Sequence, residues 1–156
     1  MRGVAISLAL ALACCSSVVE KRPTRATSKS PNGSQAIAWK IDFHLSGGLR
    51  EVDRALAISG NGELSAEDRR QSARVTGKPT AAELDRIAPL VVRIKLIPEI
   101  PRRDSSCRDC LSYNLDIEIG LERFTAHLDD TTLPGSGLEE LARALTTLLN
   151  RLLPPK

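Results

Sequence analysis

The sequence predicts an α+β domain in which an antiparallel sheet of about six strands packs against two amphipathic helices, in the order ββββαββα. Two observations predict this class. Several stretches alternate apolar and polar residues at every second position, which is the period of a half-buried strand. Two other stretches carry apolar residues at helical spacing and begin with a Thr or Ser followed three residues later by Glu.

A pair of adjacent glycines separates the first two predicted strands. Residues 38–46 and 52–58 alternate in the same phase, and Gly47-Gly48 stands between them. Neither a lysine nor a helix start accompanies the glycines, and a phosphate-binding loop would require both. The pair is therefore predicted to be the bend between two strands of one sheet.

The next segment is open to two interpretations. Residues 60–62, Gly-Asn-Gly, predict a hairpin turn, because Asn and Gly tolerate positive φ. Residues 65–68 could begin a helix, but the apolar residues of 63–79 are too sparse for a buried helical face. We therefore expect two short polar strands that extend the sheet.

A helix is predicted over residues 80–94. Thr80 and Glu83 have the spacing of a capping box, in which each side chain accepts a hydrogen bond from the other residue's backbone N–H. Pro89 lies within this helix and predicts a kink or an early end.

The last third of the chain predicts a hairpin and a closing helix. Residues 111–119 and 124–128 alternate most clearly and should pair as antiparallel strands around a turn near Gly120. Ser136 and Glu139 offer a second capping box before a stripe of leucines. This helix is expected to cover one face of the sheet.

The N-terminus has the organisation of a bacterial lipoprotein. Arg2 precedes an 11-residue apolar run, which is too short to span a bilayer and is typical of a signal peptide. A small residue stands directly before Cys14, as in a lipobox, so residues 1–13 are predicted to be the signal and Cys14 the acylated residue. Ordinary signal cleavage nearby, which would give a secreted protein, is the alternative.

The segment after Cys14 differs in composition from the rest of the chain. Residues 14–35 are rich in Ser, Thr, Pro and Lys and predict a flexible tether, which leaves 36–156 as a single domain. Residues 18–35 carry a net charge of +3, whereas 36–156 carry about −1. The folded part has no basic patch, so nucleic-acid binding is not expected. We expect a lipid-anchored protein of the cell envelope, facing the periplasm or the exterior.

Cys107 and Cys110 form a CRDC motif with three interpretations. Structural zinc usually has four ligands, and a thioredoxin-type dithiol lies at a helix N-terminus, whereas this motif leads into a strand. An exported chain meets an oxidising compartment, which favours a disulfide. Redox-active thiols and half of a metal site remain open.

The other polar residues form no recognisable catalytic pattern. His44 and His127 fall on the polar faces of two different strands, and a metal site would need a third ligand such as Asp42 or Asp129. The sequence holds no nucleophile elbow, phosphate loop or zinc-protease motif. We therefore expect no enzyme activity, no cofactor and no metal.

Four local patterns follow one another along most of residues 36–153. They are SGGLREVDRALAIS, LSAEDRR followed by RVTGKPTAAELDRIAPLV, DCLSYNLDIEI, and ERFTAHLDDTTLPGSGLEELARAL. In their order and spacing they resemble the emfourin family, named for a protein inhibitor of protealysin, a thermolysin-like zinc metalloprotease. The resemblance implies that this chain inhibits a thermolysin-like metalloprotease.

An inhibitor of this kind would place a loop in or over an active-site cleft. The candidate contact residues are Gly47, Gly48 and Leu49 in the bend, and Leu133 in TTLPGSG, whose side chain would enter a hydrophobic pocket. Two alternatives use the same chain differently. One is a non-inhibitory binding or scaffolding lipoprotein, and the other is a thiol redox protein centred on the CRDC motif.

Overall fold

The computed structural model describes residues 37–97 and 107–154, which form one six-stranded sheet with helices packed on it. The predicted order of four strands, a helix, two strands and a helix is confirmed, with η1 as an added turn of 3-10 helix. For residues 63–79 the sequence allowed either a helix or two strands, and the structure shows two strands. The elements are β1 (Trp39–Gly47), β2 (Val52–Ser59), β3 (Leu64–Asp68), β4 (Ala73–Gly77), α1 (Ala81–Arg93), η1 (Ile94–Leu96), β5 (Leu111–Ile119), β6 (Glu122–Asp129) and α2 (Glu139–Leu152).

The sheet is antiparallel throughout, in the strand order β4-β3-β2-β1-β5-β6. β1 is central, so Phe43 lies opposite Leu56 of β2 on one side and Leu115 of β5 on the other. All three side chains are almost fully buried. Because successive strand residues face opposite sides, this row and its neighbours form one apolar face.

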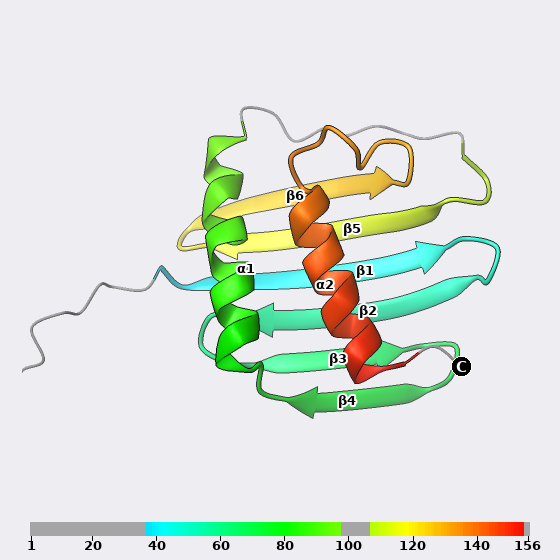
Figure 1. Cartoon of the computed structure of the whole chain (residues 1–156), viewed down its shortest axis with the longest axis horizontal. Coiled ribbons are helices and arrows are strands. Elements are labelled where there is room, and N and C mark those ends of the chain that lie inside the picture. Colours follow the sequence, from blue (N-terminus) through cyan, green and yellow to red (C-terminus); the bar gives the residue numbers. More distant parts are fainter. Residues whose placement is uncertain (1–36, 98–106, 155–156) are drawn as a thin grey trace, which may run out of the picture. The chain divides into compact units, whose positions relative to one another are not determined.

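Both helices lie on that apolar face and cross the strands (Figure 1). α1 buries Ile87 and Val91 against the sheet, and α2 buries most of its predicted leucine stripe. The opposite face of the sheet carries the polar residues of the strands. The core is therefore a single, mainly aliphatic layer between the sheet and two helices, with Trp39 and Phe43 as its buried aromatic residues.

The start of α1 is confirmed, and of the two outcomes predicted for Pro89 the early end of the helix is wrong. Thr80 Oγ1 accepts a hydrogen bond from Glu83 N at 3.3 Å, and the Glu83 carboxylate accepts one from Thr80 N at 2.8 Å. The helix continues past Pro89 to Arg93, so the proline does not end it. Asp85 and Pro89 are both exposed, and water can therefore bind the carbonyl that the proline leaves without a donor.

The predicted capping box at the start of α2 is also wrong. Leu138 occupies the N-cap position and no side chain caps the helix. Gly135 and Gly137 both adopt φ of +78°, which delays the helix until Glu139. Ser136 Oγ accepts from Leu138 N at 3.1 Å and the Glu139 carboxylate accepts from Gly135 N, so the two side chains stabilise the preceding loop instead.

Residues Ser34–Lys156 form one compact unit, distinct from Met1–Gly33. The sheet, the helices and their core all belong to this unit, so it is expected to fold on its own. The predicted signal (1–13), the acylated Cys14 and the tether (14–35) lie outside the described residues. Within residues 37–97 and 107–154, no helix is long and apolar enough to cross a membrane.

Candidate functional site

The bend between β1 and β2 presents one leucine to solvent. Leu49 is 87% exposed, in a turn closed by a hydrogen bond of 2.9 Å from Glu51 N to Gly48 O. Gly47 and Gly48 adopt φ of +89° and +71°, a left-handed conformation that glycine enters without strain. The predicted strand-to-strand bend is confirmed, and both glycines are needed for its shape.

The CRDC segment lies directly against this bend. Cys107 and Cys110 form a disulfide, and the Cys110 carbonyl oxygen accepts a hydrogen bond from Gly48 N at 3.0 Å. A Cβ at Gly47 would lie only 2.7 Å from the same oxygen, so glycine alone permits this approach. The structure therefore brings together two features that the sequence analysis treated separately.

A second support reaches the bend from the turn between β3 and β4. Arg70 Nη1 donates to the Glu51 carbonyl oxygen at 2.8 Å and also contacts the Glu51 carboxylate. An exposed ion pair contributes only about 0–1 kcal/mol to stability, but this one joins two neighbouring turns. The backbone of the bend is thus held on both sides, while the Leu49 side chain projects into solvent.

A third loop is fastened to the strand that follows the CRDC motif. The Asp130 carboxylate accepts hydrogen bonds from Leu111 N and from Tyr113 Oη, both at 2.8 Å. Burial, together with this hydrogen bond and the negative charge of Asp130, raises the pKa of Tyr113 to about 12. The start of β5, from which Cys110 reaches the bend, is therefore itself anchored.

Leu133, the other candidate contact residue, lies in a different environment. It is partly buried and packs against the core. Its loop folds around Asp129, whose Oδ1 accepts hydrogen bonds from Thr131 N and Thr132 N, both at 2.8 Å. Burial raises the pKa of the Asp129 carboxyl, but these hydrogen bonds outweigh it and hold the pKa below the ordinary 3.8. Leu133 contributes packing, which leaves the bend as the exposed candidate.

A buried ion pair near the bend was not foreseen from the sequence. Arg54 Nε donates to Asp68 Oδ2 at 2.8 Å, and Arg54 Nη1 donates to Leu153 O at 3.0 Å and Asn150 Oδ1 at 3.2 Å. Arg54 is 8% exposed and Asp68 is 4% exposed. These contacts fix the end of α2 to β2 and β3. The only sequence signal was position: Arg54 falls in phase with Leu56 and Ile58, which face the core.

No family model, curated protein or solved structure matches this chain. The resemblance to emfourins therefore depends on the four sequence patterns.

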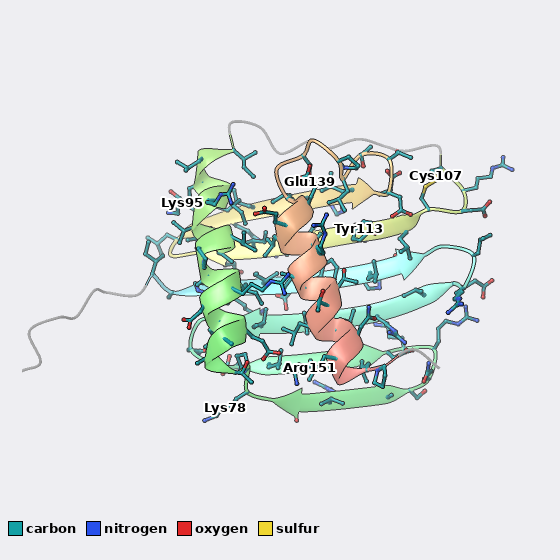
Figure 2. The ribbon with its side chains drawn as sticks, viewed as in Figure 1. Lys78, Lys95, Cys107, Tyr113, Glu139 and Arg151 are labelled. Carbon is teal, nitrogen blue, oxygen red and sulfur yellow. A yellow bond between two sulfur atoms is a disulfide. The ribbon has the colours of Figure 1, made fainter. Side chains whose placement is uncertain are left out.

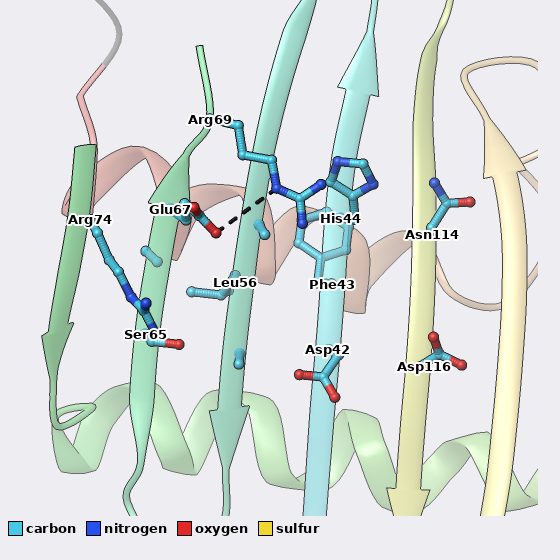
Figure 3. A pocket seen from close by; sticks show the side chains of 13 residues that line it. Asp42, Phe43, His44, Leu56, Ser65, Glu67, Arg69, Arg74, Asn114 and Asp116 are labelled. Carbon is cyan, nitrogen blue, oxygen red and sulfur yellow. Dashed lines mark ion pairs between the residues drawn. The ribbon is translucent and has the colours of Figure 1, made fainter. Parts of the chain in front are cut away.

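The uncovered face of the sheet has a shallow hollow of about 300 Å³ over Ala55 and Ala57 (Figure 3). Most of its charged groups are paired, either with each other or with side chains beside the hollow. His44 Nε2 lies 2.8 Å from Asp53 Oδ1, and Arg69 Nε lies 3.9 Å from Glu67 Oε2. We therefore interpret the hollow as part of the solvated polar face of the sheet and not as a binding site.

The two histidines do not meet on this face. β5 lies between β1 and β6, and Asn114 is paired in register with both His44 and His127. His127 Nδ1 contacts Asn114 Oδ1 at 2.7 Å. Among the residues that the structure describes, no group of three or more His, Cys, Asp or Glu side chains is placed to hold a metal ion.

Proposed function

We propose that this chain is a lipid-anchored protein inhibitor of a thermolysin-like metalloprotease, and that the β1–β2 bend is its contact with the enzyme. The observation that carries the proposal is Leu49, which is 87% exposed at a bend whose backbone is fastened by the Cys110 carbonyl and by Arg70. The SGGLREVDRALAIS pattern of the emfourin resemblance contains this same bend.

A fastened bend suits inhibition because ordering a loop on binding costs free energy. A loop already held in its bound shape avoids much of that cost. Burial of an exposed leucine in an apolar pocket contributes about 1.5–3 kcal/mol. Leu49 would supply such an anchor, provided that the enzyme offers a hydrophobic specificity pocket.

The surrounding turns would supply the rest of the contact area. A typical protease–inhibitor interface buries about 1,600 Å² in total, far more than one side chain provides. The β3–β4 turn and the CRDC segment adjoin the bend through Arg70 and Cys110. The proposed interface therefore comprises the bend and these two neighbours.

The lipid anchor is a separate part of the same proposal. Acylation of Cys14 would hold the domain at the envelope surface through the tether, residues 14–35. A labelled acyl-chain precursor should be incorporated into the wild-type chain and not into a Cys14→Ser variant. Equal labelling of the two chains, or none in either, would contradict acylation of Cys14.

The inhibitory function is tested by titration. Residues 16–156, which contain the whole compact unit Ser34–Lys156, are added to a purified thermolysin-like protease. We expect activity to fall in proportion to added domain, and a small zinc-binding active-site inhibitor to compete with it. Full activity at micromolar domain would overturn the proposal for that enzyme. A pull-down from envelope extract that recovers another class of protein would favour the scaffolding alternative.

A further inference from the structure

We propose that the end of the sheet opposite the bend contacts the membrane surface. The contact is the tip patch, defined as the apolar side chains of Ile37, Leu96 and Leu121. This inference rests on the proposed anchoring of the chain. It goes further by assigning which end of the domain faces the bilayer.

The three side chains surround the turn between β5 and β6. Gly120 N donates to Ala38 O at 2.8 Å, which places this turn beside the start of β1. Lys95 Nζ lies 2.6 Å from Glu122 Oε2, which places η1 against the same turn. Lys95 and Cys107 lie at opposite ends of the sheet (Figure 2). The three residues of the tip patch therefore lie at the same end of the sheet, remote from the bend.

The exposure of the patch is high for large apolar side chains. Leu121 is 106% exposed, Leu96 80% and Ile37 49%. Single exposed apolar residues are ordinary on protein surfaces, but three of them at one end of a sheet are consistent with a contact surface. Leu121 stands at the apex of a tight hairpin, where its side chain can enter an acyl layer without moving the backbone.

A lipid surface fits this patch better than a protein does. Three side chains offer much less than the roughly 800 Å² that each partner contributes to a stable protein interface. A bilayer needs no complementary shape, and tethering raises the effective concentration of the domain at its surface. The described part of the domain begins at Ile37, a member of the patch, so the predicted tether joins the domain close to it. Lys95 and Glu122 pair with each other, so binding is expected to depend on the apolar side chains more than on anionic lipid.

Contact of the tip patch with the membrane would also set the orientation of the domain relative to the lipid surface. β1 has nine residues and runs from the tip patch to the bend. At about 3.3 Å per residue it spans about 30 Å. With the tip patch on the membrane, Leu49 is presented away from the lipid, where a protein partner can reach it (Figure 1).

The test places one tryptophan at each end of the domain. Residues 16–156 with an N-terminal histidine tag are bound to phosphatidylcholine vesicles containing a nickel-chelating lipid, which stands in for the acyl anchor. Trp39, the single tryptophan, is replaced by Phe, and Leu121→Trp or Leu49→Trp is added. Brominated phosphatidylcholine should quench the Leu121→Trp variant strongly and the Leu49→Trp variant weakly. Equal quenching, or none at either position, would overturn the proposal.

A measurement on the unsubstituted domain guards against misfolded variants. Amide hydrogen exchange of residues 120–122 should slow when the tagged domain is bound to vesicles, and exchange of residues 48–51 should not. A dimer in the absence of vesicles that Leu121→Asp dissociates would assign the patch to a second copy and reject the lipid contact. Leu121→Asp should leave protease inhibition unchanged. Absence of inhibition in all variants would reject the proposed function and leave the quenching result standing.

Discussion

The backbone amide of Gly48 donates a hydrogen bond of 3.0 Å to the carbonyl oxygen of Cys110, and this bond joins the β1–β2 bend to a disulfide-bonded loop. The two residues are far apart in the sequence, but they meet because β1 and β5 are neighbours in the sheet. The contact gives the CRDC motif a structural role. The disulfide restrains the loop whose carbonyl positions the bend.

Gly47→Ala should lower the free energy of unfolding by more than the cost of placing alanine at a positive φ. Gly62→Ala is the matched control, because Gly62 has φ of +91° with no atom within 4 Å of its added Cβ, whereas Gly47 has φ of +89° and a Cβ 2.7 Å from Cys110 O. The control should lose about 1–2 kcal/mol of unfolding free energy. Gly47→Ala should lose clearly more in urea unfolding. Equal losses would mean that the Cys110 carbonyl does not constrain the bend.

Removal of the disulfide should loosen the bend as well as the CRDC loop. The Cys107→Ser, Cys110→Ser double variant should lose about 2 kcal/mol of stability, as expected for closure of a short loop. The Gly48 amide should then exchange faster with solvent, because its acceptor is less restrained. Amide exchange followed by NMR checks this, with Gly62 as the reference. Unchanged exchange at Gly48 would show that the bend holds its shape without the disulfide.

The Arg54–Asp68 pair should be far more sensitive to substitution than the surface pairs. Asp68→Asn leaves the buried guanidinium without its charged partner and should cost about 3–5 kcal/mol. Glu51→Gln, which breaks the exposed pair with Arg70, should cost less than about 1 kcal/mol. Urea unfolding of both variants gives the comparison. A small loss for Asp68→Asn would show that Arg54 is held mainly by Asn150 and the Leu153 carbonyl.

Stability should fall in acid through Asp129. Its pKa in the folded state lies below 3.8, the ordinary value that applies to the unfolded chain. The carboxylate therefore adds stability above pH 3.8, and this contribution is lost as the pH falls through the folded-state pKa. The unfolding free energy of Asp129→Asn should be lower near neutral pH and should vary less in this acid range. Parallel curves for the two proteins would assign the acid sensitivity to other carboxyls.

The elements of the fold follow from local patterns, and most were predictable. Alternation of apolar and polar residues locates the strands because a half-covered sheet exposes every second side chain. Thr80 and Glu83 locate the start of α1 because both hydrogen bonds of the capping box are local. Ser136 and Glu139 have the same spacing but fail to start α2. Positive φ at Gly135 and Gly137 depends on the loop's packing, which spacing does not encode.

The candidate site was predictable only in part, because its supports are non-local. The glycine pair predicts a bend, and the structure places Leu49 on its exposed surface. The contacts from Cys110 and Arg70 arise from strand pairing over long sequence separations, so no short motif signals them. Arg54 was not predictable as a buried ion-pair partner. Its sequence position points toward the core, but the contacts with Asp68 and the end of α2 that satisfy its charge form only in the folded sheet.

Inhibition constants of two leucine variants test the proposed contact most directly. Leu49 and Leu121 are both highly exposed, at 87% and 106%, and they occupy turns at opposite ends of the sheet. Against a thermolysin-like protease that residues 16–156 inhibit, Leu49→Asp should raise the inhibition constant about 100-fold, the scale of a central interface residue. Leu121→Asp should leave it unchanged. An unchanged constant for Leu49→Asp, or equal losses for both variants, would contradict the bend as the inhibitory contact.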